Sequence, residues 1–132
     1  MVKTIVVIGS RKYRDMWKVL EVLLRDVFPG NLLKDTVIMS GKCPMLDSVD
    51  NWVVDFAQIS NYYTLEVPAR KNRKEEYFKR NLIMAHYADE IVAFIPRGQL
   101  KSGAWNCISE FKKLGKTDYR VFDENGDQWD RK

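Results

Sequence analysis

The sequence predicts an α/β fold: a three-layer, Rossmann-like sandwich of about five mostly parallel strands with helices on both faces. Short runs rich in Val and Ile alternate with stretches in which apolar residues recur at helical spacing. The helical stretches are about 10 to 15 residues long, a length typical of the right-handed connections between parallel strands. A length of 132 residues suits one domain with a substantial core.

The elements follow one another in strict alternation. The runs over 3–8, 36–39, 62–67, 90–95 and 119–122 have the composition of strands, and the first suits a strand buried on both faces. Apolar residues at helical spacing predict the intervening helices, over 16–28, 46–59, 74–87 and 103–114. We therefore expect one domain over 1–122, followed by an acidic C-terminal tail over 123–132.

Composition narrows the class of protein. The longest apolar run is shorter than the roughly 20 residues that span a bilayer, and Met1 leads directly into a strand pattern without a signal peptide. The sequence thus predicts a cytoplasmic protein without a membrane partner. The two cysteines, Cys43 and Cys107, and the single His86 lack metal-ligand spacing, so neither a metal site nor a cofactor is expected. A disulfide between the two cysteines stays open.

The net charge of +4 is concentrated in one stretch, because residues 70–80 contain six basic residues against Glu75 and Glu76. Such a patch can attract nucleic acid, attract a phosphorylated small molecule, or form solvated surface. Charge alone does not distinguish these alternatives.

Small and polar residues gather near the predicted strand ends and helix starts. They form four short segments: Gly9, Ser10 and Arg11; Ser40, Gly41 and Lys42; Arg80 and Asn81; and Ser102, Gly103 and Ala104. Ligands of open α/β sheets bind outside the carboxyl ends of the strands, where Gly lets the backbone approach an anion. The four segments together predict one composite pocket.

Most of these residues also have a purely structural interpretation. Asp47 either caps the following helix or accepts hydrogen bonds from ligand hydroxyl groups. The Asn81 amide bonds either neighbouring backbone or a ligand, and Ser102 is either a simple cap or part of an anion site. Asn106, one turn into its helix, is a candidate ligand contact, whereas Asp50 and Asp55 have the spacing of solvated helix positions.

The ordered set resembles the SLOG superfamily, and within it the small YspA-like, YpsA-related proteins. The resemblance rests on Gly-Ser-Arg after the first strand, Ser-Gly with Asp47 after the second, Pro68-Ala69, Arg80-Asn81, the strand over 88–94 and Ser-Gly-Ala at the last helix. It implies a Rossmann-like pocket for nucleotides or nucleotide-derived signals such as ADP-ribose derivatives. The residues that the resemblance assigns to the pocket are Gly9, Ser10, Arg11, Ser40, Gly41, Asp47, Arg80, Asn81, Ser102, Gly103 and Asn106.

The chain departs from the family pattern where chemistry would occur. Gly41-Lys42 stands where the family often has Gly-Gly, and Gly103-Ala104 where it commonly has Gly-Thr. The phosphoribohydrolase branch carries a Glu shortly after that segment, whereas here Glu110 comes late. These departures argue against transferring the hydrolase activity.

The favoured hypothesis is a protein that senses or sequesters a nucleotide-derived small molecule, as a homo-oligomer and more as a binding protein than as an enzyme. One alternative is hydrolysis of an N-glycosidic bond with Asp47 or Glu110 as acid or base. The other is nucleic-acid binding through residues 70–80.

Overall fold

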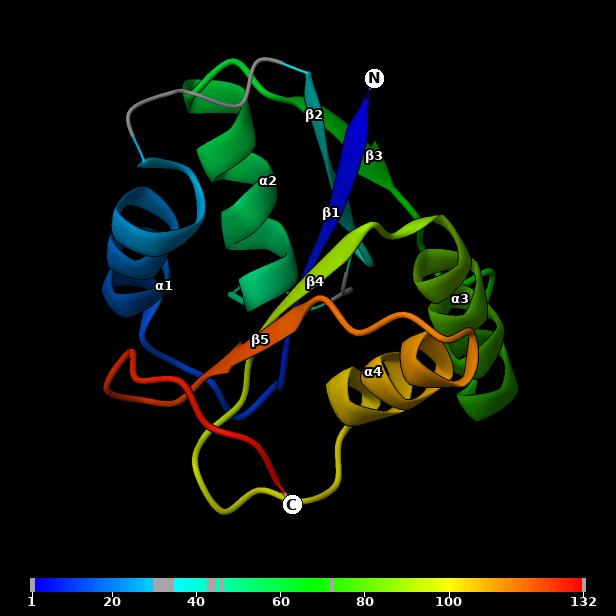
Figure 1. Cartoon of the computed structure of the whole chain (residues 1–132). Coiled ribbons are helices and arrows are strands. Elements are labelled where there is room, and N and C mark those ends of the chain that lie inside the picture. The colour runs from blue at the N-terminus through cyan, green and yellow to red at the C-terminus, as the bar shows by residue number, and fades with distance from the viewer. Residues whose placement is uncertain (1, 30–34, 43–44, 46, 72, 132) are drawn as a thin grey trace.

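The computed structural model describes residues 2–29, 35–42, 45, 47–71 and 73–131, which form a single five-stranded sheet between two helical layers (Figure 1). All strand pairs are parallel, in the order β3-β2-β1-β4-β5. The strands are β1 (Lys3–Gly9), β2 (Thr36–Ser40), β3 (Tyr63–Glu66), β4 (Glu90–Phe94) and β5 (Tyr119–Phe122). The predicted α/β sandwich is therefore confirmed.

The helices divide between the two faces of the sheet. One face carries α1 (Met16–Val22), its continuation as a π-helical turn η1 (Leu23–Val27), and α2 (Val49–Ile59). The other carries α3 (Lys74–Tyr87) and α4 (Gly103–Lys113). Helix α2 begins later than predicted, because Ser48 at its N-cap has extended backbone. Residue 46, the predicted start, lies outside the described residues.

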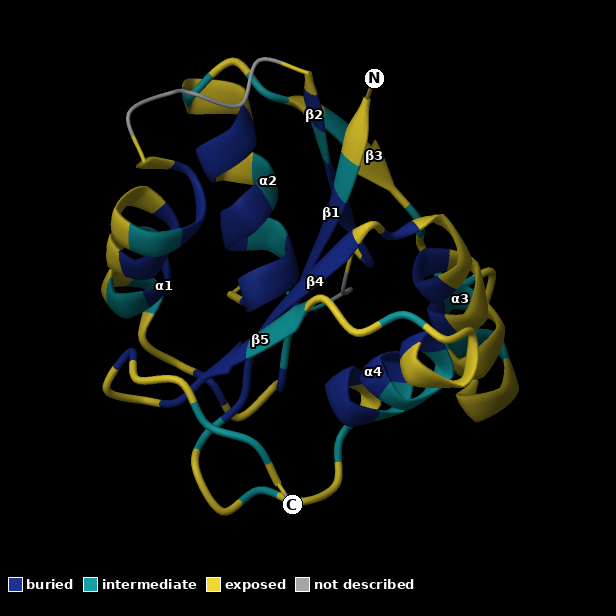
Figure 2. Ribbon diagram, viewed as in Figure 1, coloured by how far each residue is buried: buried dark blue, intermediate teal, exposed yellow. Residues whose placement is uncertain are grey.

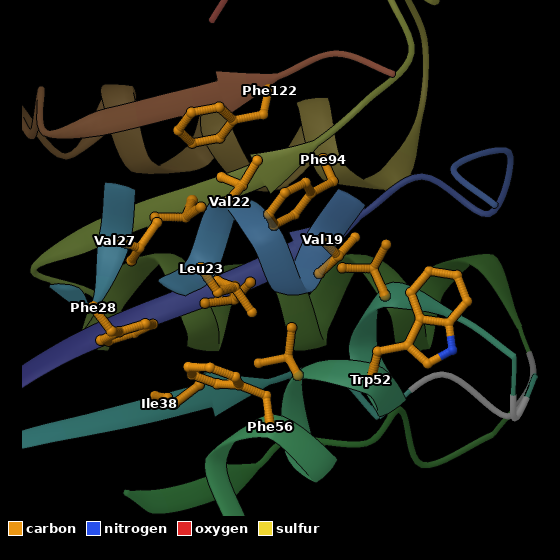
Figure 3. Close-up of a cluster of buried hydrophobic side chains, with 14 of the residues drawn as sticks. Val19, Val22, Leu23, Val27, Phe28, Ile38, Trp52, Phe56, Phe94 and Phe122 are labelled. Carbon is orange, nitrogen blue, oxygen red and sulfur yellow. The ribbon is translucent and has the colours of Figure 1, made fainter. Parts of the chain in front are cut away.

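Each face of the sheet has its own apolar cluster. Ile5 and Val7 of β1 point toward α1 and α2, whereas Val6 and Ile8 point toward α3 and α4. This alternation explains why the first strand is a continuous apolar run, as expected for a strand covered on both sides. Figure 2 shows the burial of the central strands, and Figure 3 shows the cluster under α1 and α2, where Phe94 packs near Phe122.

The segment after β5, predicted as an acidic tail, packs back onto the domain over residues 123–131. The indole Nε1 of Trp129 donates to the carbonyl of Ile95 at 2.8 Å, and the Arg131 guanidinium lies 4.7 Å from the ring centroid of Trp105. The buried Asp123 carboxylate accepts from Arg97 Nε at 2.8 Å. The segment thereby supports the loop between β4 and α4.

In the described part of the chain, no helix combines the length and apolar character needed to cross a membrane.

Candidate functional site

A cavity of about 680 Å³ opens at the carboxyl ends of β1 and β4. Within the sheet, β2 and β3 lie on one side of β1, whereas β4 and β5 lie on its other side. The order of the strands therefore reverses between β1 and β4, which is where open parallel sheets bind their ligands. Nine of the twelve predicted site residues line the cavity: Gly9, Ser10, Arg11, Arg80, Asn81, Ser102, Gly103, Ala104 and Asn106.

The loop after β1 forms one wall, and its residues have partners within the protein. A Cβ added to Gly9 would overlap the side chain of Val49, so glycine here lets α2 begin close against β1. The buried Ser10 hydroxyl donates to Gln99 Oε1 at 2.6 Å and accepts from the Lys12 amide at 3.1 Å. These contacts tie the loop after β1 to the loop after β4.

Two arginines converge on one aromatic ring at a second wall. The guanidinium carbons of Arg11 and Arg80 lie 5.5 Å and 5.0 Å from the ring centroid of Tyr77 in α3. Arg11 also donates to the Tyr77 hydroxyl at 3.3 Å, and Arg80 Nη1 donates to the Gly41 carbonyl at 3.1 Å. The buried Nε of Arg80 has no hydrogen-bond partner among the described residues.

The start of α4 forms the third wall. The Ser102 hydroxyl accepts from the Trp105 amide at 3.3 Å, which makes Ser102 a true N-cap. A Cβ added to Gly103 would meet nothing within 4 Å, so the cavity reaches the backbone at this point. Amide groups of a first helical turn lack intrahelical acceptors and favour anions. This wall therefore suits a negatively charged group.

Asn81 of α3 forms hydrogen bonds with the residues of this third wall. It is 2% exposed, and its Nδ2 donates to the Gly103 carbonyl at 3.1 Å and to Asn106 Oδ1 at 2.9 Å. Of the two interpretations, the structure shows the amide bonded within the protein. Asn81 fixes α3 against the first turn of α4.

Ser40, Gly41 and Asp47 are not among the lining residues. Ser40 is buried, and its hydroxyl donates to the Asp50 carbonyl at 2.8 Å. A Cβ added to Gly41 would lie 3.1 Å from the guanidinium carbon of Arg80, so the absence of a side chain at Gly41 leaves room for the Arg80 guanidinium. Ser40 and Gly41 therefore each contact a residue that lines the cavity, Asp50 and Arg80 respectively, without lining it themselves.

Asp47 has a structural role that neither of its two interpretations anticipated. Its exposed carboxylate accepts from Arg14 Nη2 at 2.9 Å and from the Trp52 indole at 3.1 Å. The N-cap position of α2 belongs to Ser48, which makes no side-chain cap bond, so the cap interpretation of Asp47 is wrong.

Asp50 is the functional candidate that the sequence interpretation missed. It was predicted as a solvated helix position, yet it is 8% exposed and lines the cavity; Asp55 is exposed as predicted. Asp50 precedes the buried Val53 by three residues and Ala57 by seven, which places it on the buried side of α2. That spacing was the available signal.

Most of the charged residues that line the cavity are basic. Arg11, Lys12, Lys74 and Arg80 contribute four positive charges, and Asp50 is the only carboxylate among the described lining residues. Lys12 and Lys74 were not predicted as site residues. An excess of positive charge in a concave, partly apolar cavity attracts anions and focuses the field within it.

Cys107, beneath the α3–α4 contact, is a free thiol. Burial raises its pKa to about 12, so it is protonated and inert at neutral pH. Cys43, the other half of the disulfide left open by the sequence, lies outside the described residues. Within the described ranges, no group of three or more His, Cys, Asp or Glu side chains is arranged to hold a metal ion.

Comparisons with protein-family models, with curated proteins and with solved structures find no match for this chain.

Proposed function

We propose that this protein binds a nucleotide-derived small molecule, such as an ADP-ribose derivative, in the cavity between the ends of β1 and β4, and acts as its sensor or sequestering protein. The observation that carries the proposal is the cavity itself: four basic side chains surround a space that reaches the open backbone of Gly103. Phosphate suits both features, because guanidinium groups and helix amide groups donate to it.

The shape of the site favours a small molecule over a nucleic-acid strand. Its volume of about 680 Å³ lies within the range of roughly 300–1,000 Å³ that is typical of small-molecule sites. Of the basic residues over 70–80, Lys74 and Arg80 line the cavity, whereas Lys71 is exposed outside it. The basic stretch therefore contributes in part to a concave site.

The positions of the acid or base candidates favour binding over hydrolysis. Asp47 pairs with Arg14, and Glu110 pairs with Lys113 at 3.1 Å along α4. Neither carboxylate is among the residues that line the cavity. The general acid or base of a glycosidic cleavage must lie within hydrogen-bond reach of the bond that breaks.

Calorimetric titration with AMP and ADP-ribose at several salt concentrations tests the proposal. Loss of a charge-assisted hydrogen bond costs about 1.5–3 kcal/mol, so Arg11→Ala should weaken binding by roughly 10- to 150-fold. Lys71→Ala, the matched control, should change it less than about twofold. Lys74→Ala is not a control, because Lys74 lines the cavity.

Salt dependence separates the nucleic-acid alternative. A protein with six or more phosphate contacts loses roughly three to five decades of affinity between 50 and 200 mM salt, whereas a site for one or two phosphate groups loses far less. Tight, steeply salt-dependent binding of single-stranded DNA, weakened by Lys71→Ala, would contradict the proposal.

We also expect a homo-oligomer. Exposed apolar side chains on α3, namely Leu82, Ile83 and Tyr87, offer a contact surface. Sedimentation velocity of the wild type and of Leu82→Glu tests this expectation, and a monomer at all concentrations would contradict it.

A further inference from the structure

The two edges of the sheet differ in what covers them. Beyond β5, Gln128 forms an antiparallel bridge with Phe122, and the Trp129 amide donates to the Val121 carbonyl at 3.0 Å. The C-terminal segment thus pairs with that edge. Among the described residues, no strand or bridge pairs with the outer edge of β3 (Figure 1). An open strand edge presents amide and carbonyl groups that a further strand can bind.

The outward groups of β3 belong to alternate residues. The Val67 amide donates to the Ser40 carbonyl of β2 at 2.8 Å. Because the backbone groups of a strand point to its two sides in turn, the Leu65 amide also faces β2, whereas the amides of Thr64 and Glu66 face outward. Neither outward amide donates a hydrogen bond within the described part of the chain.

β3 lacks the features that keep edge strands from pairing. Such strands commonly carry Lys, Pro or a bulge, whereas β3 consists of Tyr-Thr-Leu-Glu and pairs with β2 in unbroken register. Tyr63 and Leu65 are 76% and 50% exposed. Val67, two residues further on, packs with the cluster under α3 and α4, so Tyr63 and Leu65 project from that same face of the sheet. Apolar side chains therefore accompany the open backbone groups.

A second copy of this chain is complementary to this edge. When β3 pairs antiparallel with β3 of the second copy and the two Thr64 residues lie opposite each other, they exchange amide-to-carbonyl hydrogen bonds. Tyr63 then lies opposite Leu65 of the second copy, twice by symmetry, and such aromatic–aliphatic pairs across strands stabilise sheets. We propose that two copies join through β3 into one continuous sheet.

The charges near the strand are compatible with this register. Glu66 is the only charged residue of β3, and its carboxylate pairs with Lys42 at 3.4 Å. With Thr64 on the twofold axis, the two Glu66 residues lie four positions apart along the strands, roughly 14 Å at about 3.4 Å per residue. This separation exceeds the Debye length of about 8 Å at physiological ionic strength. The pairing therefore brings no like charges together.

The inference rests on the homo-oligomer expected under the proposed function, and it assigns the contact to β3 in place of α3. It does not depend on the ligand, because no residue of β3 lines the cavity. The two surfaces can therefore be distinguished in the protein without ligand.

Amide hydrogen exchange of the wild type tests the pairing without any substitution. At concentrations where sedimentation velocity shows a dimer, the Thr64 and Glu66 amides should exchange at least about tenfold more slowly than in dilute protein, because only the dimer gives them acceptors. The Leu65 amide faces β2 in either state, so it is the internal control and should change far less.

Thr64→Pro removes an outward amide and keeps the ladder with β2, since proline is tolerated on an edge strand where its nitrogen faces solvent. The dissociation constant of the dimer should rise roughly tenfold or more, because two hydrogen bonds are lost per dimer. Thr64→Ala is the matched control: it shortens the same side chain, keeps the amide and should change the constant by about threefold or less.

The outcomes are distinguishable. A wild type that is monomeric at every concentration overturns both the inference and the expected homo-oligomer. A dimer in which the Thr64 amide exchanges as fast as in the monomer overturns the inference alone, as does a dimer that persists unchanged in folded Thr64→Pro. Dissociation of such a dimer by Leu82→Glu would assign the contact to α3. If Thr64→Pro does not fold, amide exchange of the wild type decides the matter.

Discussion

Gly103 allows the proposed anion site to be tested without disturbing the fold. The residue begins α4, and an added Cβ would meet nothing within 4 Å. Its carbonyl already accepts from Asn81, a contact that any side chain at 103 can keep. Three variants, Gly103→Ala, Gly103→Asn and Gly103→Asp, therefore place increasing bulk and then charge into the cavity on an unchanged backbone.

The substitutions at Gly103 should change stability and affinity in opposite directions: stability is kept or increased, while affinity for AMP decreases. Replacing a glycine by alanine where the backbone permits it stabilises a protein by about 0.4–1 kcal/mol, and an acidic residue in the first helical turn adds about 0.3–1 kcal/mol. Two like charges 4 Å apart repel by about 4 kcal/mol at an effective dielectric constant of 20. Gly103→Asp should therefore be at least as stable as the wild type, yet bind AMP at least about 100-fold more weakly.

Thermal unfolding and calorimetry with AMP measure the two effects on the same samples. Gly103→Asn is the matched control, since it has nearly the size of Asp without the charge, and it should lose about tenfold or less. A folded Gly103→Asp protein with unchanged affinity for AMP would refute the placement of the phosphate at the start of α4.

Two further predictions concern stability. Gly9→Ala should destabilise the protein by about 1–3 kcal/mol in chemical denaturation, because the added methyl meets Val49, and Val49→Ala should restore part of the loss; an unchanged midpoint would contradict the packing role of Gly9. Burial opposes the ionisation of Asp123, but hydrogen bonds from the Asp127 amide and the Arg97 guanidinium outweigh it and lower its pKa below the ordinary 3.8. The ionised Asp123 carboxylate thus stabilises the fold above about pH 3.8, and this contribution is lost as the pH falls through its lowered pKa. Asp123→Asn should cost about 1–3 kcal/mol at pH 7, a difference that shrinks in unfolding measured below pH 4, and a constant difference would exclude the carboxylate charge as its cause.

The fold was predictable because apolar residues are spaced differently along the strands and along the helices. The middle of β1, from Ile5 to Ile8, is apolar at every position since both of its faces are covered, and α2 and α4 carry their buried residues at helical spacing. The boundaries were less accurate. A π-helical turn continues α1, and α2 begins only at Val49, because such details depend on how a helix end packs against the rest of the protein.

The location of the cavity was predictable for a different reason. Parallel strands bring their carboxyl ends to one edge of the sheet, so segments distant in sequence must meet there. That rule placed the loop after β1 and the start of α4 at one cavity, which residues in the middle of α3 also line. It could not tell which side chains turn into the cavity, because orientation depends on neighbours that the local sequence does not identify.

Asp47 and Asp50 illustrate that limit. Both lie near the start of α2, and the sequence favoured Asp47 as the ligand contact. In the structure, Asp47 turns outward to Arg14 and Trp52, while Asp50 faces the cavity. Arg14 precedes Asp47 by 33 residues, so no local pattern announces the pair.

The three glycines at and near the cavity differ in what an added Cβ would meet. At Gly9 and Gly41, a Cβ would meet Val49 or Arg80, so the absence of a side chain serves contacts within the protein. At Gly103 a Cβ would meet empty space, so no internal contact requires glycine there. Alanine would also favour the helix, which makes glycine at this position costly to the free protein. Under the proposed function, a ligand that approaches the backbone at Gly103 would supply the missing reason, so we expect substitutions at this residue, more than at Gly9 or Gly41, to report on binding and not on folding.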